Sequence, residues 1–279
     1  MRRLFPLCLG LALLGAPPAR LDAPKGTLVI VGGGGFPDDV REAFLQACGG
    51  PGAVIGIIPS ASSEPAARLA EWKADLAKAH ITLVPLDIRR RAQSDDPALL
   101  KAASRCTGFW FSGGDQSRIG DWIVGTRLHD VLRQRYAEGA AVGGTSAGAA
   151  IMSQTMLTGE DRQGKETLAD LAPGAYRTRP GMGFLPSHCV VDQHFLRRNR
   201  QNRLFSILLD HPGALGLGID EATALVVKDG QARVLGERAV MVFDGQGMAS
   251  QVPGTFRDLR LHLLRKGQGI DLATRALLP

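Results

Sequence analysis

Residues 140–149 of this 279-residue chain read Ala140-Ala-Val-Gly-Gly-Thr-Ser-Ala-Gly-Ala149. A short apolar run leads into the pattern Gly144-x-Ser146-x-Gly148, and a stretch typical of a helix follows. This pattern predicts a nucleophile elbow, in which a strand turns sharply into a helix and exposes a serine hydroxyl held in a strained conformation. The helix start behind the serine directs free N–H groups to the place where an oxyanion would form. The alternative is a glycine-rich turn with an ordinary N-cap serine, because such pentapeptides recur by chance.

Short apolar runs alternate with helix-like stretches on both sides of this elbow. We expect strands at 27–31, 53–58, 81–86, 108–111 and 140–143, and helices at 38–48, 65–79, 97–104 and 116–137. Ser62 or Ser63 is the expected cap of the second helix. This alternation predicts an α/β fold with a mostly parallel sheet flanked by helices on both faces.

Antiparallel hairpins are expected towards the C-terminus. Residues 228–231 read Lys-Asp-Gly-Gln, which predicts a hairpin turn after a β-branched strand. Residues 239–243 are the expected partner of that strand.

Glycine and small polar residues follow four of the expected strands, at 32–35, at 60–63, at 112–116 and in the elbow. Ligands of parallel sheets gather beyond the carboxyl ends of the strands, so these loops predict one shared site. The glycines at 32–35 lack the spacing of a dinucleotide-binding loop, and Asp38 and Asp39 would lie close to a pyrophosphate. A tight turn that approaches the site closely is the expected role of this loop.

A serine nucleophile needs a base, and His194 is the best candidate among the six histidines. It ends an apolar strand that turns polar, and Asp192, Gln193 and several arginines lie nearby in the sequence. Arg198 and Arg200 are two residues apart and cannot share one helical stripe. We therefore expect a turn that wraps substrate rather than a solvated helix face.

A carboxylate should orient the imidazole and stabilise its charged form. Asp220 and Glu221 precede a β-branched strand, and successive strand side chains face opposite ways. Either residue could be the one that faces the site. The spacing alone leaves both open.

The N-terminus has the pattern of a secretory signal. Met1-Arg2-Arg3 precedes an apolar run over 4–14, which is too short to span a bilayer comfortably. We expect a signal peptide over 1–23, a single catalytic α/β domain over 24–279, and a secreted or periplasmic protein. Ala16, Ala19 and Ala23 are candidate cleavage positions, and a disordered cytoplasmic leader is the alternative.

Charge and cysteine content limit the partners. The net charge of +6 is spread along the chain, so we expect no nucleic-acid partner, and no second apolar run predicts a membrane span. Cys48, Cys106 and Cys189 remain beyond the leader. One disulfide among them and three buried thiols are equally compatible with this number.

Five separated motifs follow one another along most of residues 27–245. They are Phe111-Ser-Gly-Gly-Asp-Gln116, Gly144-Thr-Ser-Ala-Gly-Ala149, Asp192-Gln-His-Phe195, the Arg198, Arg200, Arg203-Leu204 pattern, and Gly218-Ile-Asp-Glu-Ala-Thr-Ala-Leu225. In this order they resemble the cyanophycinase branch of the serine peptidases that also include aspartyl dipeptidase. The leader and the residues after about 250 add nothing to the resemblance.

The resemblance implies a class I glutamine amidotransferase-like α/β fold without cofactor or metal. It assigns Ser146 as nucleophile, His194 as general base and then acid, and Glu221 as the orienting carboxylate. Gly114 and Ala147 would supply the oxyanion-hole N–H groups. The substrate pocket would be lined by Gln116, Asp192, Gln193, Arg198, Arg200 and Arg203. Family members suggest a homodimer, which the sequence itself leaves open.

The activity implied is that of a secreted exopeptidase that acts on cyanophycin, a poly-aspartate that carries arginine on each β-carboxyl. We expect an acyl-enzyme formed by attack of Ser146 on the isopeptide carbonyl, with release of β-Asp-Arg dipeptides. The arginines would bind carboxylates, while Gln116 and Asp192 would accept from a guanidinium.

Three alternatives come from other readings of the same residues. Small isoaspartyl peptides are alternative substrates, because residues 154–176 depart from the family pattern. A non-catalytic polymer-binding protein on the same fold is another possibility. A zinc site built from His188, Cys189, Asp192 and His194 matches no familiar ligand spacing.

Overall fold

The computed structural model describes residues 24–76, 79–161, 171–250 and 254–279. The predicted signal peptide, residues 1–23, lies outside the described residues. Within them, the main sheet has nine strands in the order β15-β14-β11-β10-β1-β5-β4-β2-β3. Its parallel half consists of β1 (Leu28–Val31), β2 (Val54–Ile58), β3 (Thr82–Pro85), β4 (Gly108–Phe111) and β5 (Ala141–Thr145). Its antiparallel half consists of β10 (Thr223–Lys228), β11 (Gln231–Gly236), β14 (Gly269–Asp271) and β15 (Leu277–Leu278).

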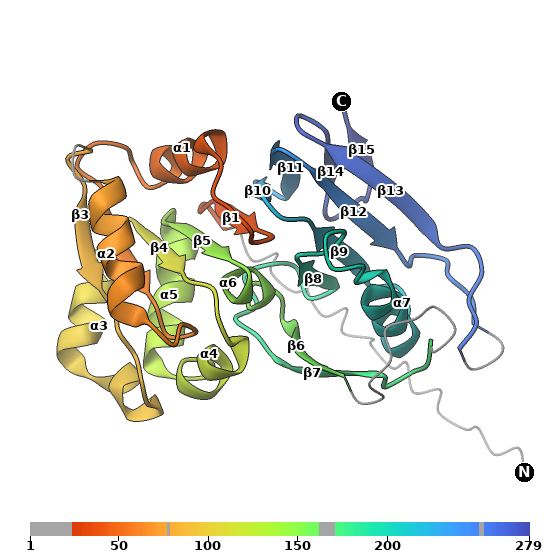
Figure 1. The fold of residues 1–279 in the computed structure, drawn as a ribbon, viewed down its shortest axis with the longest axis horizontal. Helices are drawn as coiled ribbons and strands as arrows, with labels where there is room; N and C mark the ends of the chain where they lie inside the picture. Colours follow the sequence, from red (N-terminus) through yellow and green to blue (C-terminus); the bar gives the residue numbers. More distant parts are fainter. Residues whose placement is uncertain (1–23, 77–78, 162–170, 251–253) are drawn as a thin grey trace, which may run out of the picture.

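Side chains of the parallel strands alternate between two apolar cores, one on each face of the sheet. On β1, Leu28 and Ile30 join one core, whereas Val29 and Val31 join the other. The first core is covered by α3 (Pro97–Ala103), α4 (Gln116–Trp122), α5 (Arg127–Glu138) and α6 (Ala147–Ala150), and a 3-10 helix at Arg91–Asp95 packs on α3 and α5. The second core is covered by α1 (Asp38–Ala47) and α2 (Pro65–Asp75) (Figure 1).

A smaller sheet packs beside this unit. It runs in the order β13 (Arg260–Arg265), β12 (Ala239–Asp244), β9 (Leu215–Ile219) and β8 (Cys189–Gln193). Its inner face adds Val191 and Leu217 to the first core, and α7 (Gln201–Asp210) covers its outer face (Figure 1). A two-stranded ribbon of β6 (Thr155–Asp161) and β7 (Tyr176–Pro180) lies against β8 and α7.

The predicted fold class is confirmed. Helices flank both faces of a sheet whose first five strands are parallel, and antiparallel hairpins follow near the C-terminus. The expected helix over 116–137 is two helices, because Gly125 adopts a φ of +72° and the Thr126 side chain caps α5.

Two local expectations are wrong. The N-cap of α2 is Glu64 rather than Ser62 or Ser63, although the Ser62 hydroxyl accepts a hydrogen bond from the Glu64 amide. The hairpin partner of β10 is β11, with Lys228 opposite Gln231. Residues 239–244 instead form β12, which pairs with β9 and β13 in the smaller sheet.

The carboxyl ends of β1, β4 and β5 meet at one edge of the main sheet, and β8 of the smaller sheet ends beside them. Ser146 donates its amide to Val31 at the end of β1, and His194 donates its amide to Gly32. This edge therefore brings together loops that lie more than 150 residues apart in the chain. No helix in the described parts of the chain is long and apolar enough to cross a membrane.

Candidate active site

Ser146 lies at the sharp turn between β5 and α6. Its φ of 55° and ψ of −110° are strained for a residue with a side chain. Gly144 and Gly148 make the turn possible, since a Cβ on Gly144 would lie 2.5 Å from the Gly148 carbonyl oxygen. A Cβ on Gly148 would lie 2.2 Å from the carbonyl oxygen of Phe111. The elbow predicted from the sequence is thus the local geometry of the chain.

His194 connects Ser146 to Glu221. Its Nε2 lies 3.0 Å from Ser146 Oγ, and its Nδ1 lies 2.6 Å from Glu221 Oε1. A carboxylate only accepts hydrogen bonds, so Nδ1 carries the proton and Nε2 accepts from the serine hydroxyl. The three side chains are therefore in the order that nucleophilic catalysis requires.

Asp220, the other carboxylate that the sequence left open, faces away from this arrangement. It is 3% exposed, and its Oδ1 accepts the amide of Arg197 at 2.8 Å. Its Oδ2 lies 3.9 Å from an Arg238 Nη1 atom. The two neighbouring acids thus take opposite sides of the chain.

The glycine loop after β1 forms the support of the imidazole and the carboxylate. A Cβ on Gly33 would lie 2.3 Å from His194 Cε1, and one on Gly34 would lie 2.6 Å from the Glu221 side chain. The Gly33 carbonyl accepts the amide of Ala222 at 2.8 Å. Only glycine leaves room here for both side chains. The sequence placed this loop near the site but not against these two residues.

Burial and nearby charges tune the histidine. Desolvation lowers the pKa of His194, the Glu221 hydrogen bond raises it, and the cations Arg198 and Arg200 lower it, with a net shift below the usual value of 6.5. The hydrogen bond from His194 is the main reason that the pKa of Glu221 is lowered. At neutral pH the imidazole is therefore neutral and able to accept a proton, beside an ionised carboxylate.

Free amides surround the serine hydroxyl. Within the described residues, the amides of Gly114 and Ala147 donate to no protein acceptor. Ala147 is the first residue of α6, and Gly114 lies in the loop after β4, next to Gly113, whose added Cβ would lie 3.3 Å from Ser146 Cβ. Both amides predicted from the sequence are thus available to an oxyanion, which is the group that such donors stabilise.

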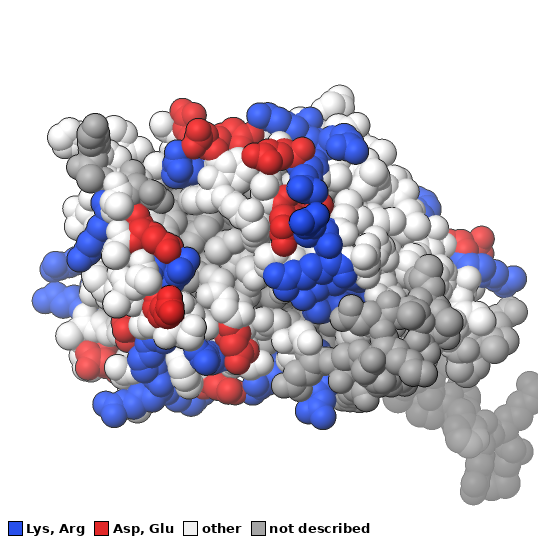
Figure 2. All heavy atoms as spheres, in the orientation of Figure 1, with Lys and Arg blue, Asp and Glu red and all other residues white. Residues whose placement is uncertain are grey.

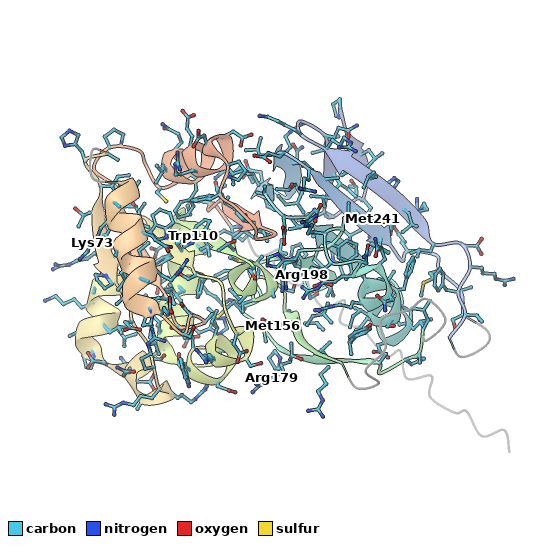
Figure 3. All side chains as sticks on the ribbon, in the orientation of Figure 1. Lys73, Trp110, Met156, Arg179, Arg198 and Met241 are labelled. Carbon is cyan, nitrogen blue, oxygen red and sulfur yellow. The ribbon has the colours of Figure 1, made fainter. Side chains whose placement is uncertain are left out.

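Ser146 lies where two cavities meet. The larger cavity, of about 550 Å³, is lined by the glycine loop, His194, Gly113 and the N-terminal half of α2. The smaller cavity, of about 400 Å³, is lined by Gly114, the start of α4 and the arginines that follow β8. Figure 3 places Trp110 and Arg198 on opposite sides of α6, the helix that begins after the serine. A substrate that crosses Ser146 can therefore extend in both directions.

Four of the six predicted substrate-binding residues line the smaller cavity. They are Gln116, Gln193, Arg198 and Arg200. Gln116 Nε2 donates to the carbonyls of Leu157 and Thr158, which fixes the orientation of its amide. An Arg200 Nη1 atom donates to the carbonyl of Gln193 at 2.8 Å. Figure 2 shows Lys and Arg gathered over this part of the surface.

Asp192 and Arg203 lie behind this cavity instead of in its wall, which differs from the sequence expectation. They are 1% and 2% exposed, and Arg203 Nε lies 3.0 Å from Asp192 Oδ2. The N–H does not point directly at the oxygen, so this is an ion pair rather than a well-formed hydrogen bond. Arg203 also lies 5.8 Å from the centre of the Tyr176 ring. The pair supports Arg200 and Gln193 from within and cannot itself meet a substrate guanidinium.

The four residues of the alternative zinc site have other partners. Nε2 of His188 lies 2.8 Å from the carbonyl oxygen of Leu272, and burial raises the pKa of the Cys189 thiol to about 12. Asp192 pairs with Arg203, and His194 with Ser146 and Glu221. Among the described residues, no group of three or more His, Cys, Asp or Glu is arranged to hold a metal ion.

Residues 27–235 match the sequence profile of Peptidase family S51. The chain belongs to peptidase family S51. The resemblance stated from the sequence motifs is thereby confirmed, as is the prediction of a serine-type peptidase.

Curated S51 relatives extend over most of the chain. A protein named cyanophycinase from Geminocystis herdmanii is 36% identical over 251 residues, which cover 85% of this chain and 89% of the relative. A cyanophycinase from Synechococcus elongatus is 37% identical over 270 residues, 90% of this chain and 80% of the relative. The crystal structure of a peptidase from an acI-B1 Actinobacterium shares the fold, with a TM-score of 0.66 at 22% identity over 89% of this chain and 98% of that one.

Proposed function

We propose that this S51 peptidase hydrolyses cyanophycin to β-Asp-Arg dipeptides through a serine acyl-enzyme. The observation that carries the proposal is the hydrogen-bonded series Ser146, His194 and Glu221 at the junction of two cavities. The names of the relatives supply the substrate class. Ser146 is the nucleophile, His194 the base and then the acid, and Glu221 the residue that orients the imidazole.

The first half of the reaction forms the acyl-enzyme. Ser146 Oγ attacks the scissile carbonyl while His194 Nε2 accepts the hydroxyl proton. The amides of Gly114 and Ala147 stabilise the oxyanion, and the imidazolium then protonates the leaving amine. In the second half, water attacks the ester with His194 again as base, and the acid product leaves with Ser146 restored.

The chemistry of the product specifies the bond that is cut. A β-Asp-Arg dipeptide keeps its isopeptide bond, so its release from the polymer requires cleavage of the main-chain amide between aspartates. The isopeptide attack expected from the sequence would release free arginine and leave the poly-aspartate chain intact. Attack on a β-aspartyl carbonyl fits only the small isoaspartyl peptides that are the alternative substrates.

The smaller cavity receives the acyl part of the substrate. Arg198 and Arg200 line it and offer forked donors to carboxylate oxygens. In a β-Asp-Arg unit, the α-carboxylate of the arginine is such a group. This position gives the enzyme a reason to act on units that carry a free carboxylate.

The site of action is proposed to be outside the cytoplasm. The support is the sequence pattern of residues 1–23, a basic start followed by a short apolar run. An exported enzyme would digest polymer released by other cells. Expression of the full chain followed by fractionation and N-terminal sequencing of the recovered protein tests this, and recovery of an intact N-terminus in the cytoplasm would contradict it.

The test of the activity is incubation of purified protein with insoluble cyanophycin and identification of the soluble products. The wild type should release β-Asp-Arg, and Ser146→Ala should release none. Ser104→Ala, at an exposed serine after α3, is the matched control and should act as the wild type does. Cleavage of short isoaspartyl peptides with no action on polymer would replace the proposed substrate, and binding without products from either would contradict catalysis.

A further inference from the structure

The two cavities at Ser146 differ in which catalytic groups line them. His194 lines the larger cavity, whereas Gly114 and the arginines after β8 line the smaller one. The imidazolium must reach the leaving amine to protonate it. The larger cavity, called here the leaving-group cavity, is therefore on the side where the departing part of the substrate lies.

The inner wall of the leaving-group cavity is aromatic. Phe36, Trp72 and Trp110 line it and also pack on one another. The ring centres of Phe36 and Trp110 are 4.6 Å apart, and those of Trp72 and Trp110 are 5.3 Å apart. The two tryptophans are held rigidly, being 2% and 7% exposed, so they offer fixed surfaces rather than mobile ones.

The outer wall is acidic. Glu64 and Glu71 line the cavity from the start and the middle of α2, and both are exposed. An Nη1 atom of Arg68 lies 2.8 Å from Glu71 Oε2, with both side chains substantially exposed. A guanidinium thus already lies against Glu71 at the edge of the cavity. An exposed pair of this kind is weak and can exchange with a ligand that brings the same group.

We propose that the leaving-group cavity is a subsite for a guanidinium side chain on the residue that departs from Ser146. This inference rests on the proposed function and adds the specificity of the side opposite to the arginines. The methylene stem of the departing arginine lies on the aromatic wall, and its guanidinium stacks on an aromatic face and meets Glu71 and Glu64. A neutral side chain of the same shape fills the cavity but lacks the charge-assisted contacts.

The charges of the cleft agree with this direction of binding. Carboxylates lie on the leaving-group cavity, while Arg198 and Arg200 lie on the smaller cavity. Figure 2 shows the basic band beside a hollow, with acidic and basic side chains on the opposite rim. Within a zwitterionic polymer, this arrangement places a guanidinium on one side of the serine and a carboxylate on the other.

The test uses a substrate of two β-Asp-Arg units joined through the aspartate main chain. In one analogue citrulline, a neutral isostere, replaces the arginine of the leaving unit, and in another it replaces the arginine of the acyl unit. With the wild type, citrulline in the leaving unit should lower kcat/KM by about tenfold or more, as the loss of a charge-assisted contact does. The acyl-unit replacement should have a smaller effect.

Variants assign the discrimination to the acidic wall. The double variant Glu64→Gln with Glu71→Gln should cut the arginine and citrulline leaving units at similar kcat/KM, with the change mostly in KM. Glu42→Gln, an exposed glutamate on α1, should keep the wild-type preference.

The outcomes separate this inference from the proposed function. Equal cleavage of the arginine and citrulline leaving units by the wild type would overturn the guanidinium subsite and leave the peptidase activity standing. A preference that persists in the double variant would also overturn it. No cleavage of any two-unit substrate or of polymer by the wild type would overturn the proposed function itself. The wild-type comparison alone decides the subsite, even where the double variant does not fold.

Discussion

Backbone strain is concentrated at the residues that form the candidate triad. Ser146 has a φ of 55°, His194 a φ of 51°, and Ala222, next to Glu221, a φ of 49°. Each such conformation costs about 1 to 3 kcal/mol for a residue with a side chain. The surrounding hydrogen bonds hold them, since the Ser146, His194 and Ala222 amides all donate to the β1 strand end or its glycine loop. The glycine loop therefore couples the positions of all three catalytic groups.

Gly33→Ala tests this coupling. The new Cβ would meet the imidazole at 2.3 Å, so we expect kcat to fall by about 100-fold or more, the effect of a displaced catalytic group. Gly49→Ala is the matched control, because Gly49 has a φ of +108° beside the +100° of Gly33, and its Cβ would meet nothing within 4 Å. Steady-state kinetics and thermal unfolding should show similar destabilisation of both variants, about 1 to 2 kcal/mol, and loss of activity only in Gly33→Ala. Equal activities would show that the loop does not position His194.

The pH dependence of kcat/KM tests the charge around His194. Burial, Arg198 and Arg200 hold the pKa of His194 below 6.5, and the base must be neutral, so activity should fall as the pH drops through this lowered pKa. Arg198→Met removes a cation that lowers the pKa of His194, so the acidic limb should move to higher pH. Arg105→Met, at an exposed arginine beyond α3, should leave the limb in place. A limb that stays fixed or moves to lower pH in Arg198→Met would contradict this assignment.

The sequence predicted the candidate site to different depths at different residues. Ser146 and His194 follow from local patterns, because an elbow and a polar strand end are written in neighbouring residues. The choice of Glu221 over Asp220 followed only from the family resemblance, since strand alternation allows either. Burial of Asp192 and Arg203 depends on how β8, α7 and Tyr176 pack, which neighbouring residues do not specify.

At the scale of elements, an ion pair joins β8 to α7. Arg203 on α7 and Asp192 on β8 are both almost fully buried, and Arg200 at the N-cap of α7 extends from the same place into the smaller cavity. Removal of one partner leaves an uncompensated buried charge, which is far more costly than the loss of a surface pair. The pair therefore fixes the strand and helix that carry His194 and the arginines.

Arg203→Met should lower the free energy of unfolding by about 3 to 5 kcal/mol, and Asp192→Asn combined with it should recover part of the loss. Arg135→Met is the control, since Arg135 forms an exposed pair with Glu138 at 2.5 Å, and its pair should contribute at most about 1 kcal/mol. Urea unfolding measures all three variants. A loss in Arg203→Met no larger than that in Arg135→Met would show that the pair does not join the two elements.

Local patterns predicted most elements but not their long-range pairing. Alternation of apolar runs identified β1 to β5 and the helices between them to within a few residues. The division of 116–137 depends on the backbone of Gly125, which a periodic apolar pattern does not reveal. The partner of β10 was wrong because the nearer run, 231–236, is less apolar than 239–244, yet a two-residue turn at Asp229 and Gly230 brings it into register first.

At the scale of the whole molecule, the three cysteines beyond the leader are free and buried. Burial raises the pKa of Cys48 and Cys189 to about 12 and that of Cys106 to about 11. Of the two possibilities that their number allowed, the structure has three thiols and no disulfide among them. Thiolates are the reactive form, so these side chains should be inert while the protein is folded.

Titration with an aromatic disulfide reagent tests this in a Cys8→Ser chain. The folded protein should react at no thiol, and the denatured protein should react at all three, with activity unaffected by a reducing agent. Reaction at fewer than three thiols after unfolding would indicate a disulfide, and rapid reaction of the folded protein would contradict their burial.

The central claim is that His194 and Glu221 activate Ser146 as a nucleophile. Labelling with a fluorophosphonate, followed by peptide mapping by mass spectrometry, measures this directly. The account predicts an adduct on Ser146 in the wild type and loss of labelling in His194→Ala, with both proteins folded by circular dichroism. An adduct on another residue, or labelling of Ser146 in His194→Ala at the wild-type rate, would contradict it.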